Sequence, residues 1–256
     1  MSTATIGIIG GMGPHAGVYL AERIVAHTRA GGDSGHVSMV LSSRPSEIAD
    51  RSTYLADPTS PSPSPGIWDV ALELIQGGAT VLGMPCNTAH AHPILDPVLD
   101  RLSAEHPEVR FLHLIRETVE YCGQAAPDAR KIGVLATLGT YRTRLYANTL
   151  EEAGLIPVVP DPDVQRDLVH RSLYDPAFGI KFGSDPVSEE ALELLSLATE
   201  HLIEGGAEAV ILGCTELPLA IPGRTFSGIP VVDSTTALAR ALIAAVAPEK
   251  LKVLAN

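Results

Sequence analysis

The sequence predicts an α/β protein of two similar lobes, each a mostly parallel sheet flanked by helices. A stretch occurs twice, as Leu74-Ile-Gln-Gly-Gly-Ala and as Leu202-Ile-Glu-Gly-Gly-Ala, and a cysteine follows the first glycine of each copy by nine residues, from 77 to 86 and from 205 to 214. A second, weaker repeat pairs Ile6-Gly-Ile-Ile-Gly with Ile132-Gly-Val-Leu-Ala. A repeat this long indicates a duplicated domain. Apolar segments also alternate with helical ones, which is typical of parallel sheets covered on both faces.

The first lobe is expected to comprise residues 1–115 and 230–256. Pro14 can open a helix, because the first helical position needs no backbone N–H. The segment Pro58 to Pro65 is rich in proline and serine and is expected to be a surface loop of the kind that often covers or binds a ligand. The expected elements are strands at 5–9, 37–41, 80–84 and 110–114, and helices at 14–29, at 67–76, from near Thr88 and up to Cys122.

The second lobe, residues 116–229, is expected to repeat this plan. Its expected elements are strands at 131–136, 155–159 and 208–212 and helices at 140–153, 162–173 and 187–204. An irregular segment is expected from Tyr174 to Pro186. The chain then forms a strand at 229–232 and a helix from Ser234, which is expected to pack on the first lobe.

Composition predicts a globular protein and excludes several partners. Hydrophobic residues make up 45% of the 256 residues, and no apolar run approaches the roughly 18 residues that span a bilayer. The N-terminus does not resemble a secretory signal, so a cytoplasmic location is expected. The net charge of −12 argues against nucleic acid or an anionic membrane as a partner. An odd number of cysteines, three, argues against a disulfide framework and leaves thiols free for chemistry.

Cys86 and Cys214 each stand where a strand is expected to give way to a helix. Ligands of such folds bind outside the carboxyl ends of the strands, and a helix N-terminus lowers the pKa of a thiol there. Two cysteines on facing lobes could flank one substrate carbon, so that one thiolate removes a proton while the other thiol delivers one to the opposite face. The product would be the mirror image. A single cysteine in an apolar run is more simply a small buried hydrophobe, and Cys122 is interpreted in that way.

Polar neighbours of the two cysteines suit a carboxylate ligand. Asn87, Thr88 and Thr215 supply side-chain donors beside the free N–H groups of a helix start. The glycine-rich loop at 10–13, which includes Met12, and the loop at 137–140 would bring backbone close to the same ligand. Donors aimed at the charge that gathers in the transition state are each worth on the order of 10²-fold in rate.

The motifs Met84-Pro-Cys86-Asn-Thr-Ala-His90 and Leu212-Gly-Cys214-Thr-Glu216 resemble those of the cofactor-independent aspartate/glutamate racemase family. The opening Gly10-Gly-Met-Gly-Pro14 and the pair Asp50-Arg51 are similar to the aspartate racemase branch. The resemblance covers nearly the whole chain. It implies two α/β lobes with the active site in the cleft between them, a homodimer, and racemisation of an acidic amino acid, aspartate above all, by a thiol/thiolate pair without pyridoxal phosphate.

The resemblance also implies roles for particular residues. Cys86 and Cys214 would be the two acid/base groups. Binding of the α-carboxylate and amino group would involve Asn87, Thr88, Thr137, Thr140 and Thr215, with Met12 as a further substrate contact. Arg51 and Lys181, the latter within Gly179-Ile-Lys-Phe-Gly183, would recognise the side-chain carboxylate, since a cation pair suits the distal end of a dicarboxylate.

Departures from the family patterns leave alternatives open. Glutamate racemases carry an aspartate in the first glycine loop and a histidine after the second cysteine, where this chain has Gly-Met-Gly and Glu216. Related enzymes such as a hydantoin racemase, a maleate isomerase or a decarboxylase are the nearest rivals. A protein that binds a carboxylate without catalysis is the alternative from a different class.

No cofactor or metal is expected. Gly11-Met-Gly13-Pro-His-Ala16 fits a loose dinucleotide pattern, but no acidic residue ends the second strand to bind a ribose. His90 and His92 lie near Cys86, yet their spacing matches no strong zinc pattern. His90 is interpreted either as a residue that orients a neighbour at the helix start or as a solvated histidine.

Overall fold

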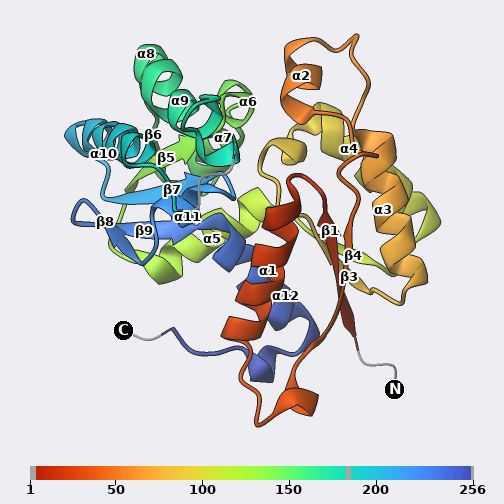
Figure 1. Cartoon of the computed structure of the whole chain (residues 1–256). Coiled ribbons are helices and arrows are strands. Elements are labelled where there is room, and N and C mark those ends of the chain that lie inside the picture. Colours follow the sequence, from red (N-terminus) through yellow and green to blue (C-terminus); the bar gives the residue numbers. More distant parts are fainter. Residues whose placement is uncertain (1–3, 183–185, 255–256) are drawn as a thin grey trace. The chain divides into compact units, whose positions relative to one another are not determined.

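The computed structural model describes residues 4–182 and 186–254, and its internal contacts divide the chain into two compact units (Figure 1). Unit 1 is Met1–Glu117 with Thr235–Asn256, and unit 2 is Thr118–Ser234. The boundary placed at 230 from the sequence falls inside a strand, Ile229–Asp233, that pairs with the sheet of unit 2. The return to unit 1 therefore begins with the helix that follows this strand.

Unit 1 contains a sheet of four parallel strands in the order β2-β1-β3-β4. The strands are β1 (Thr5–Gly10), β2 (Ser38–Ser43), β3 (Val81–Gly83) and β4 (Arg110–Leu112). The helices are α1 (Pro14–His27), α2 (Arg51–Ala56), α3 (Ser64–Gln76), α4 (His92–Glu105) and most of α12 (Ser234–Val246), with single 3-10 turns at Asp33–Gly35, Thr88–His90 and Pro248–Lys250. Helix α5 (Leu114–Ala125) crosses from unit 1 into unit 2.

The alternation of side chains along β1 explains how helices cover both faces of this sheet. Ile6 and Ile8 are fully buried in a cluster with residues of α1 and α12. Gly7 points to the opposite face, where a Cβ would meet Leu74 of α3 at 3.3 Å. Successive residues of a strand face opposite sides, so α3 covers the face opposite to α1 and α12.

Unit 2 contains a sheet in the order β6-β5-β7-β9-β8, in which only β8 runs antiparallel to its neighbour. The strands are β5 (Lys131–Ala136), β6 (Ile156–Val158), β7 (Ala209–Gly213), β8 (Thr225–Phe226) and β9 (Ile229–Asp233). The helices are α6 (Leu138–Arg142), α7 (Leu145–Glu152), α8 (Pro162–Val164), a π-helical turn at Gln165–His170, α9 (Arg171–Tyr174), a 3-10 turn at Ile180–Phe182, α10 (Glu189–Glu204) and α11 (Leu217–Ala220).

Helix α10 covers one face of the second sheet. Its residues Leu195 and Leu202 are fully buried in a cluster with Leu135 of β5 and Leu212 of β7. The central strands follow the same order as in unit 1, since β2-β1-β3-β4 matches β6-β5-β7-β9. The predicted fold class, an α/β protein with two mostly parallel sheets flanked by helices, is confirmed.

Several segments differ from the elements expected from sequence, including α11 and β8, which lie where no regular structure was expected. The helix expected at 140–153 is two helices, because Arg144 adopts a left-handed backbone conformation with φ 54° between α6 and α7. The helix expected at 162–173 contains a π-helical turn. Between β2 and α3, where no regular structure was expected before the loop at 58–65, the chain forms α2. The N-cap of α2 is Asp50, whose side chain accepts a hydrogen bond from Thr53 N–H at 2.7 Å.

No helix within residues 4–182 and 186–254 is both long enough and apolar enough to cross a bilayer.

Candidate active site

Cys86 lies just beyond the carboxyl end of β3, and the one-turn 3-10 helix Thr88–His90 follows it at once. Its thiol side chain is buried, with 6% of the residue exposed. The backbone of this loop is tightly bonded, because Cys86 N–H donates to Met84 O at 2.9 Å and Ala89 N–H donates to Cys86 O at 3.2 Å. The loop therefore fixes the position of the cysteine through its own backbone.

His90 adds a second restraint to the Cys86 loop. Leu114 N–H donates to His90 Nε2 at 3.2 Å, and His90 Nδ1 lies 2.8 Å from Cys86 O. An Nε2 that accepts leaves the proton on Nδ1, so Nδ1 donates to the carbonyl of Cys86. The ring is fully enclosed, and burial together with the neighbouring His113 lowers the pKa of His90 to about 3. Of the two interpretations made from sequence, the structure supports a neutral histidine that orients its neighbour.

Cys214 directly follows the last residue of β7. Ala136 of β5 pairs with Gly213, so the residues after them, Thr137 and Cys214, emerge side by side at the carboxyl edge of the sheet. A Cβ on Gly213 would lie 2.8 Å from the ring of Tyr146, so a larger residue would displace that ring or the strand. Glycine at 213 thus allows β7 to end close to α7.

The Cys214 thiol belongs to a network of charged side chains. Its Sγ donates to Glu216 Oε2 at 3.0 Å, and Thr215 Oγ1 donates to the same oxygen at 3.2 Å. The other carboxylate oxygen, Oε1, accepts from Lys181 Nζ at 2.5 Å. Lys181 Nζ also lies 5.5 Å from the centre of the Tyr174 ring. One carboxylate thus joins the second cysteine to the lysine.

Burial and charge act on this network in opposite directions. Burial raises the pKa of the Cys214 thiol, and the Glu216 carboxylate raises it further, although Lys181 opposes both. Burial would also raise the pKa of Glu216, but the charge and hydrogen bonds of Lys181, together with those of Cys214 and Thr215, lower it below its usual value. Burial would lower the pKa of Lys181, yet the thiolate form of Cys214 and the carboxylate of Glu216 raise it. The favoured state is a neutral thiol beside a carboxylate–ammonium pair.

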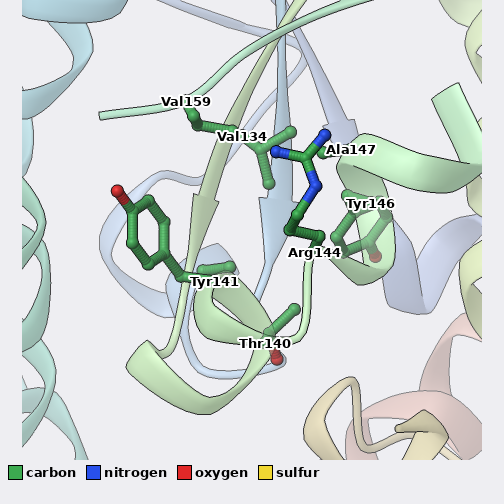
Figure 2. A pocket seen from close by; sticks show the side chains of 8 residues that line it. Val134, Thr140, Tyr141, Arg144, Tyr146, Ala147 and Val159 are labelled. Carbon is green, nitrogen blue, oxygen red and sulfur yellow. The ribbon is translucent and has the colours of Figure 1, made fainter. Parts of the chain in front are cut away.

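Thr137 is the N-cap of α6, the helix that follows β5, and Thr140 lies in its first turn. The side chain of Thr137 accepts from Thr140 N–H at 3.4 Å, and the two hydroxyl oxygens lie 3.1 Å apart. Thr140 also borders a hollow on unit 2 of about 260 Å³, part of it open to solvent (Figure 2). Cys214 is not among the residues that line this hollow, and Arg144, which does line it, is hydrogen-bonded to Asn148 and Glu151 at 3.1 and 2.9 Å.

Arg51 is the first residue of α2, directly after the N-cap Asp50. Its Nη1 donates to Ala49 O at 3.3 Å, whereas its buried Nε has no hydrogen-bond partner among the described residues. Helix α2 contacts the 3-10 helix Thr88–His90, so Arg51 belongs to the element beside the Cys86 loop. Among the described residues, this guanidinium forms no ion pair with a carboxylate.

The remaining predicted contacts are buried beside the same loops. Met12 is 3% exposed in the turn after β1, and Asn87, Thr88 and Thr215 are each less than a tenth exposed. Gly11 in that turn has φ 97° and lies against Arg44 and Pro45, which explains a glycine there. Gly183 of the motif around Lys181 lies outside the described residues.

The structure therefore groups the predicted site residues within each unit. In unit 1 the loop of Cys86 adjoins α2, which carries Arg51, and in unit 2 Cys214 adjoins Thr137, Thr215 and the Lys181 network. Sequence reasoning missed Glu216 as the partner of both Cys214 and Lys181. The signal available for it was its position two residues after the cysteine. Among the described residues, no three or more His, Cys, Asp or Glu side chains gather in a way that could hold a metal ion.

Comparisons with known proteins indicate the family and the fold of this chain. The family model of the Asp/Glu/hydantoin racemases matches residues 9–242. The chain is 25% identical over 245 residues to a broad-specificity amino-acid racemase of Bacillus subtilis, covering 93% of this chain and 96% of that protein. It resembles the structure of the aspartate racemase of Picrophilus torridus, with 29% identity, a TM-score of 0.70 and coverage of 95% and 94% of the two chains. An aspartate racemase homologue from Pyrococcus horikoshii gives 26% identity, a TM-score of 0.66 and coverage of 94% and 98%. With the family model matching nearly its whole length, and with a cysteine at the end of β3 and another at the end of β7, the chain belongs to the Asp/Glu/hydantoin racemase family.

Proposed function

We propose that this protein racemises an acidic amino acid, aspartate above all, by proton transfer between Cys86, Cys214 and the α-carbon without a cofactor. The observation that carries the proposal is the equivalence of the two cysteines. Each follows the third strand of its sheet in the chain, and the two sheets share one strand order. A duplicated fold that retains a cysteine at both equivalent positions suits a reaction that needs one acid and one base.

The chemistry assigns a simple step to each sulfur. A thiolate on one cysteine removes the α-proton, and the thiol of the other delivers its proton to the opposite face of the carbanion. The carbanion places extra negative charge beside the α-carboxylate. Buried hydroxyl, amide and N–H donors stabilise such charge, and Asn87, Thr88, Thr137, Thr140 and Thr215 are our candidates for that role.

Recognition of the side-chain carboxylate is assigned to Arg51 and Lys181, with different weight. Among the described residues the guanidinium of Arg51 donates to Ala49 O and forms no ion pair with a carboxylate, so its charge is available to a ligand. Lys181 already pairs with Glu216, and a ligand would have to share its ammonium. We therefore assign the main contact to Arg51.

A second candidate function follows from the Lys181–Glu216 pair. If Glu216 neutralises Lys181, the site offers one uncompensated cation rather than two, and neutral amino acids would bind more easily. The similarity to a broad-specificity amino-acid racemase supports this alternative. Racemisation of a range of amino acids is thus the rival to strict aspartate specificity.

Proton exchange at the α-carbon tests both candidates. Purified protein without added cofactor would be incubated in heavy water with L-aspartate, L-glutamate and L-alanine separately, and followed by ¹H NMR and chiral chromatography. Loss of the α-proton signal with growth of the D-isomer for aspartate alone would support the first candidate. Exchange with all three would favour broad specificity.

The same experiment has an outcome against the proposal. If no amino acid loses its α-proton while maleate or a hydantoin is converted, racemisation of free amino acids is the wrong reaction. Binding of aspartate without exchange would indicate a protein that binds a carboxylate without catalysis.

A further inference from the structure

We propose that Glu216 and Lys181 are positioning residues that hold Cys214 as a thiol, so that Cys214 is the acid and Cys86 the base when the resting enzyme meets its substrate. This inference rests on the proposed two-cysteine reaction and assigns a direction to it. Cys214, Glu216 and Lys181 belong to one hydrogen-bonded network within unit 2.

The geometry gives each oxygen of Glu216 a distinct partner. Oε2 accepts the S–H of Cys214 at 3.0 Å, and Oε1 accepts from the ammonium of Lys181. The side chains of Lys181 and Glu216 are only 21% and 14% exposed. A buried carboxylate that already has an ammonium partner stays ionised and acts as an acceptor only. The proton shared between Cys214 and Glu216 therefore resides on sulfur.

The directions of the titrations agree with this placement of the proton. Burial and the adjacent carboxylate raise the pKa of Cys214, whereas Lys181 and the hydrogen bonds from Thr215 and Cys214 outweigh burial and lower the pKa of Glu216. The charged groups that act on this thiol are Glu216 and Lys181, and Tyr174 lies against the ammonium. No such carboxylate hydrogen-bonds the Cys86 thiol among the described residues.

The proton balance of the first turnover follows from this assignment. The Cys86 thiolate takes the α-proton, so a C–H bond breaks and an S–H bond forms. The electron pair left on carbon then takes the proton of Cys214, whose S–H bond breaks. Cys214 becomes a thiolate beside a carboxylate, and the Lys181 ammonium offsets the repulsion between them.

A role in packing alone is the competing explanation, and it predicts different behaviour. If the pair merely fills space, removing either member would loosen the loop and expose Cys214 in both cases. If the pair sets the charge state of the thiol, the two removals act in opposite directions. Loss of the carboxylate leaves a cation facing the sulfur and favours the thiolate, whereas loss of the ammonium leaves an anion and disfavours it.

Thiol labelling separates these explanations without reference to racemase activity. Wild type, Glu216→Gln and Lys181→Met would be treated with methyl methanethiosulfonate across pH 6–10, and labelling of each cysteine read from tryptic peptides. We expect Glu216→Gln to label Cys214 at least about tenfold faster near neutral pH, because a shift of one pKa unit changes the thiolate fraction tenfold. Lys181→Met should label it more slowly than wild type.

Cys122 provides the internal control for loosening. This thiol is buried and hydrogen-bonds to Thr118 O, and burial raises its pKa to about 12, so its labelling should stay unchanged in both variants. Faster labelling of Cys214 in both variants, or equal labelling in all three proteins, would overturn the proposal. If the two variants show the expected labelling shifts but the protein exchanges no α-proton, the effect of Glu216 and Lys181 on the Cys214 thiol is supported. The proposed function is then refuted.

Discussion

Cys86 and Cys214 occupy equivalent places at the ends of β3 and β7, but their surroundings differ in kind. The Cys86 loop is held by a neutral network, in which His90 bridges the carbonyl of Cys86 and the N–H of Leu114. The Cys214 thiol is held by charges, through Glu216 and Lys181. In unit 1 the restraint acts on the backbone, whereas in unit 2 it acts on the sulfur.

This difference shows that a duplicated backbone fixes where a thiol lies but leaves its protonation state to its neighbours. An acid and a base need different proton affinities although both are cysteines. The carboxylate of Glu216, two residues after Cys214, gives the two thiols different proton affinities with little change in structure. Variants of the two cysteines and of the residues around them test whether both thiols are equally necessary and whether their surroundings restrain them differently.

The largest effect is expected from removing either thiol. Cys86→Ala and Cys214→Ala should each lower the rate of racemisation by at least about 10²- to 10⁴-fold, which is the contribution of a positioned acid or base. The measurement is D-aspartate formation by chiral chromatography, with circular dichroism as a check on folding. Cys122→Ala is the matched control, because this thiol has a hydrogen bond to Thr118 O but no assigned role.

An activity near that of wild type in either single variant would contradict a two-base reaction. Loss of activity in Cys214→Ala alone would instead indicate a single-cysteine enzyme.

A large loss of stability is expected from His90→Phe. Phenylalanine keeps the ring volume but removes the acceptor of Leu114 N–H and one of the two donors to Cys86 O, which still accepts from Ala89 N–H. Losing a hydrogen-bond partner at a buried group costs about 1–3 kcal/mol, so the free energy of unfolding at pH 8, measured with urea, should fall by about that amount. His92→Phe is the matched control, since that side chain is 82% exposed and should change stability by less than about 0.5 kcal/mol.

The pH dependence of the same variant has a defined sign. The pKa of His90 is lowered to about 3 in the folded protein, so the unfolded chain binds a proton below about 6.5 that the folded chain refuses. The stability from the neutral ring is present above that pH and is lost as the pH falls toward 3. The difference in the free energy of unfolding between wild type and His90→Phe should narrow over this range. A constant difference would exclude a neutral buried His90.

Much of the fold and the positions of the two cysteines could be predicted from the sequence, because both depend on local repeats. The twin motifs around Cys86 and Cys214 and the alternation of apolar and helical segments predicted the α/β lobes and placed both cysteines after strands. Arg144 and α2 were not predictable in this way. A left-handed residue within a helical pattern and a six-residue helix capped by Asp50 depend on single backbone conformations that periodicity does not reveal.

The role of Glu216 could not be predicted for a different reason. Lys181 lies 35 residues before it in the chain, and the sequence shows no pattern that links the two. The sequence therefore predicts Lys181 as a ligand of the substrate's side-chain carboxylate and does not indicate its contact with Glu216. Only the folded chain reveals that this cation already has a carboxylate partner, which shifts the expected recognition of an acidic substrate toward Arg51.

A moderate and selective effect is expected from Arg51→Gln. Losing a charge-assisted contact to the side-chain carboxylate should raise KM for aspartate by about 10- to 100-fold, since hydrogen bonds to charged groups contribute about 1.5–3 kcal/mol. KM for a neutral amino acid, where it is a substrate, should change little. Steady-state kinetics with both substrates measures this, and Arg101→Gln on the exposed side of α4 is the control. An equal rise in KM for both substrates would mean that Arg51 stabilises the structure beside the Cys86 loop and does not recognise the substrate's side chain.

The smallest effect is expected from Asp50→Ala, which removes the cap that holds Arg51 at the start of α2. Loss of a side-chain cap costs about 1 kcal/mol, and a frayed first turn should raise KM for aspartate a few-fold, with little change in kcat. Asp50→Asn is the matched variant, because an amide oxygen still accepts from Thr53 N–H. Burial would raise the pKa of Asp50, but the hydrogen bonds from Thr53 and the charge of Arg51 lower it, so the ionised cap is stabilising above about pH 4 and its contribution fades in acid. If Asp50→Ala instead lowers kcat as much as a cysteine variant does, α2 takes part in the proton transfer. Charged residues of unit 1 would then act on the reaction in addition to the neutral network that holds the Cys86 loop.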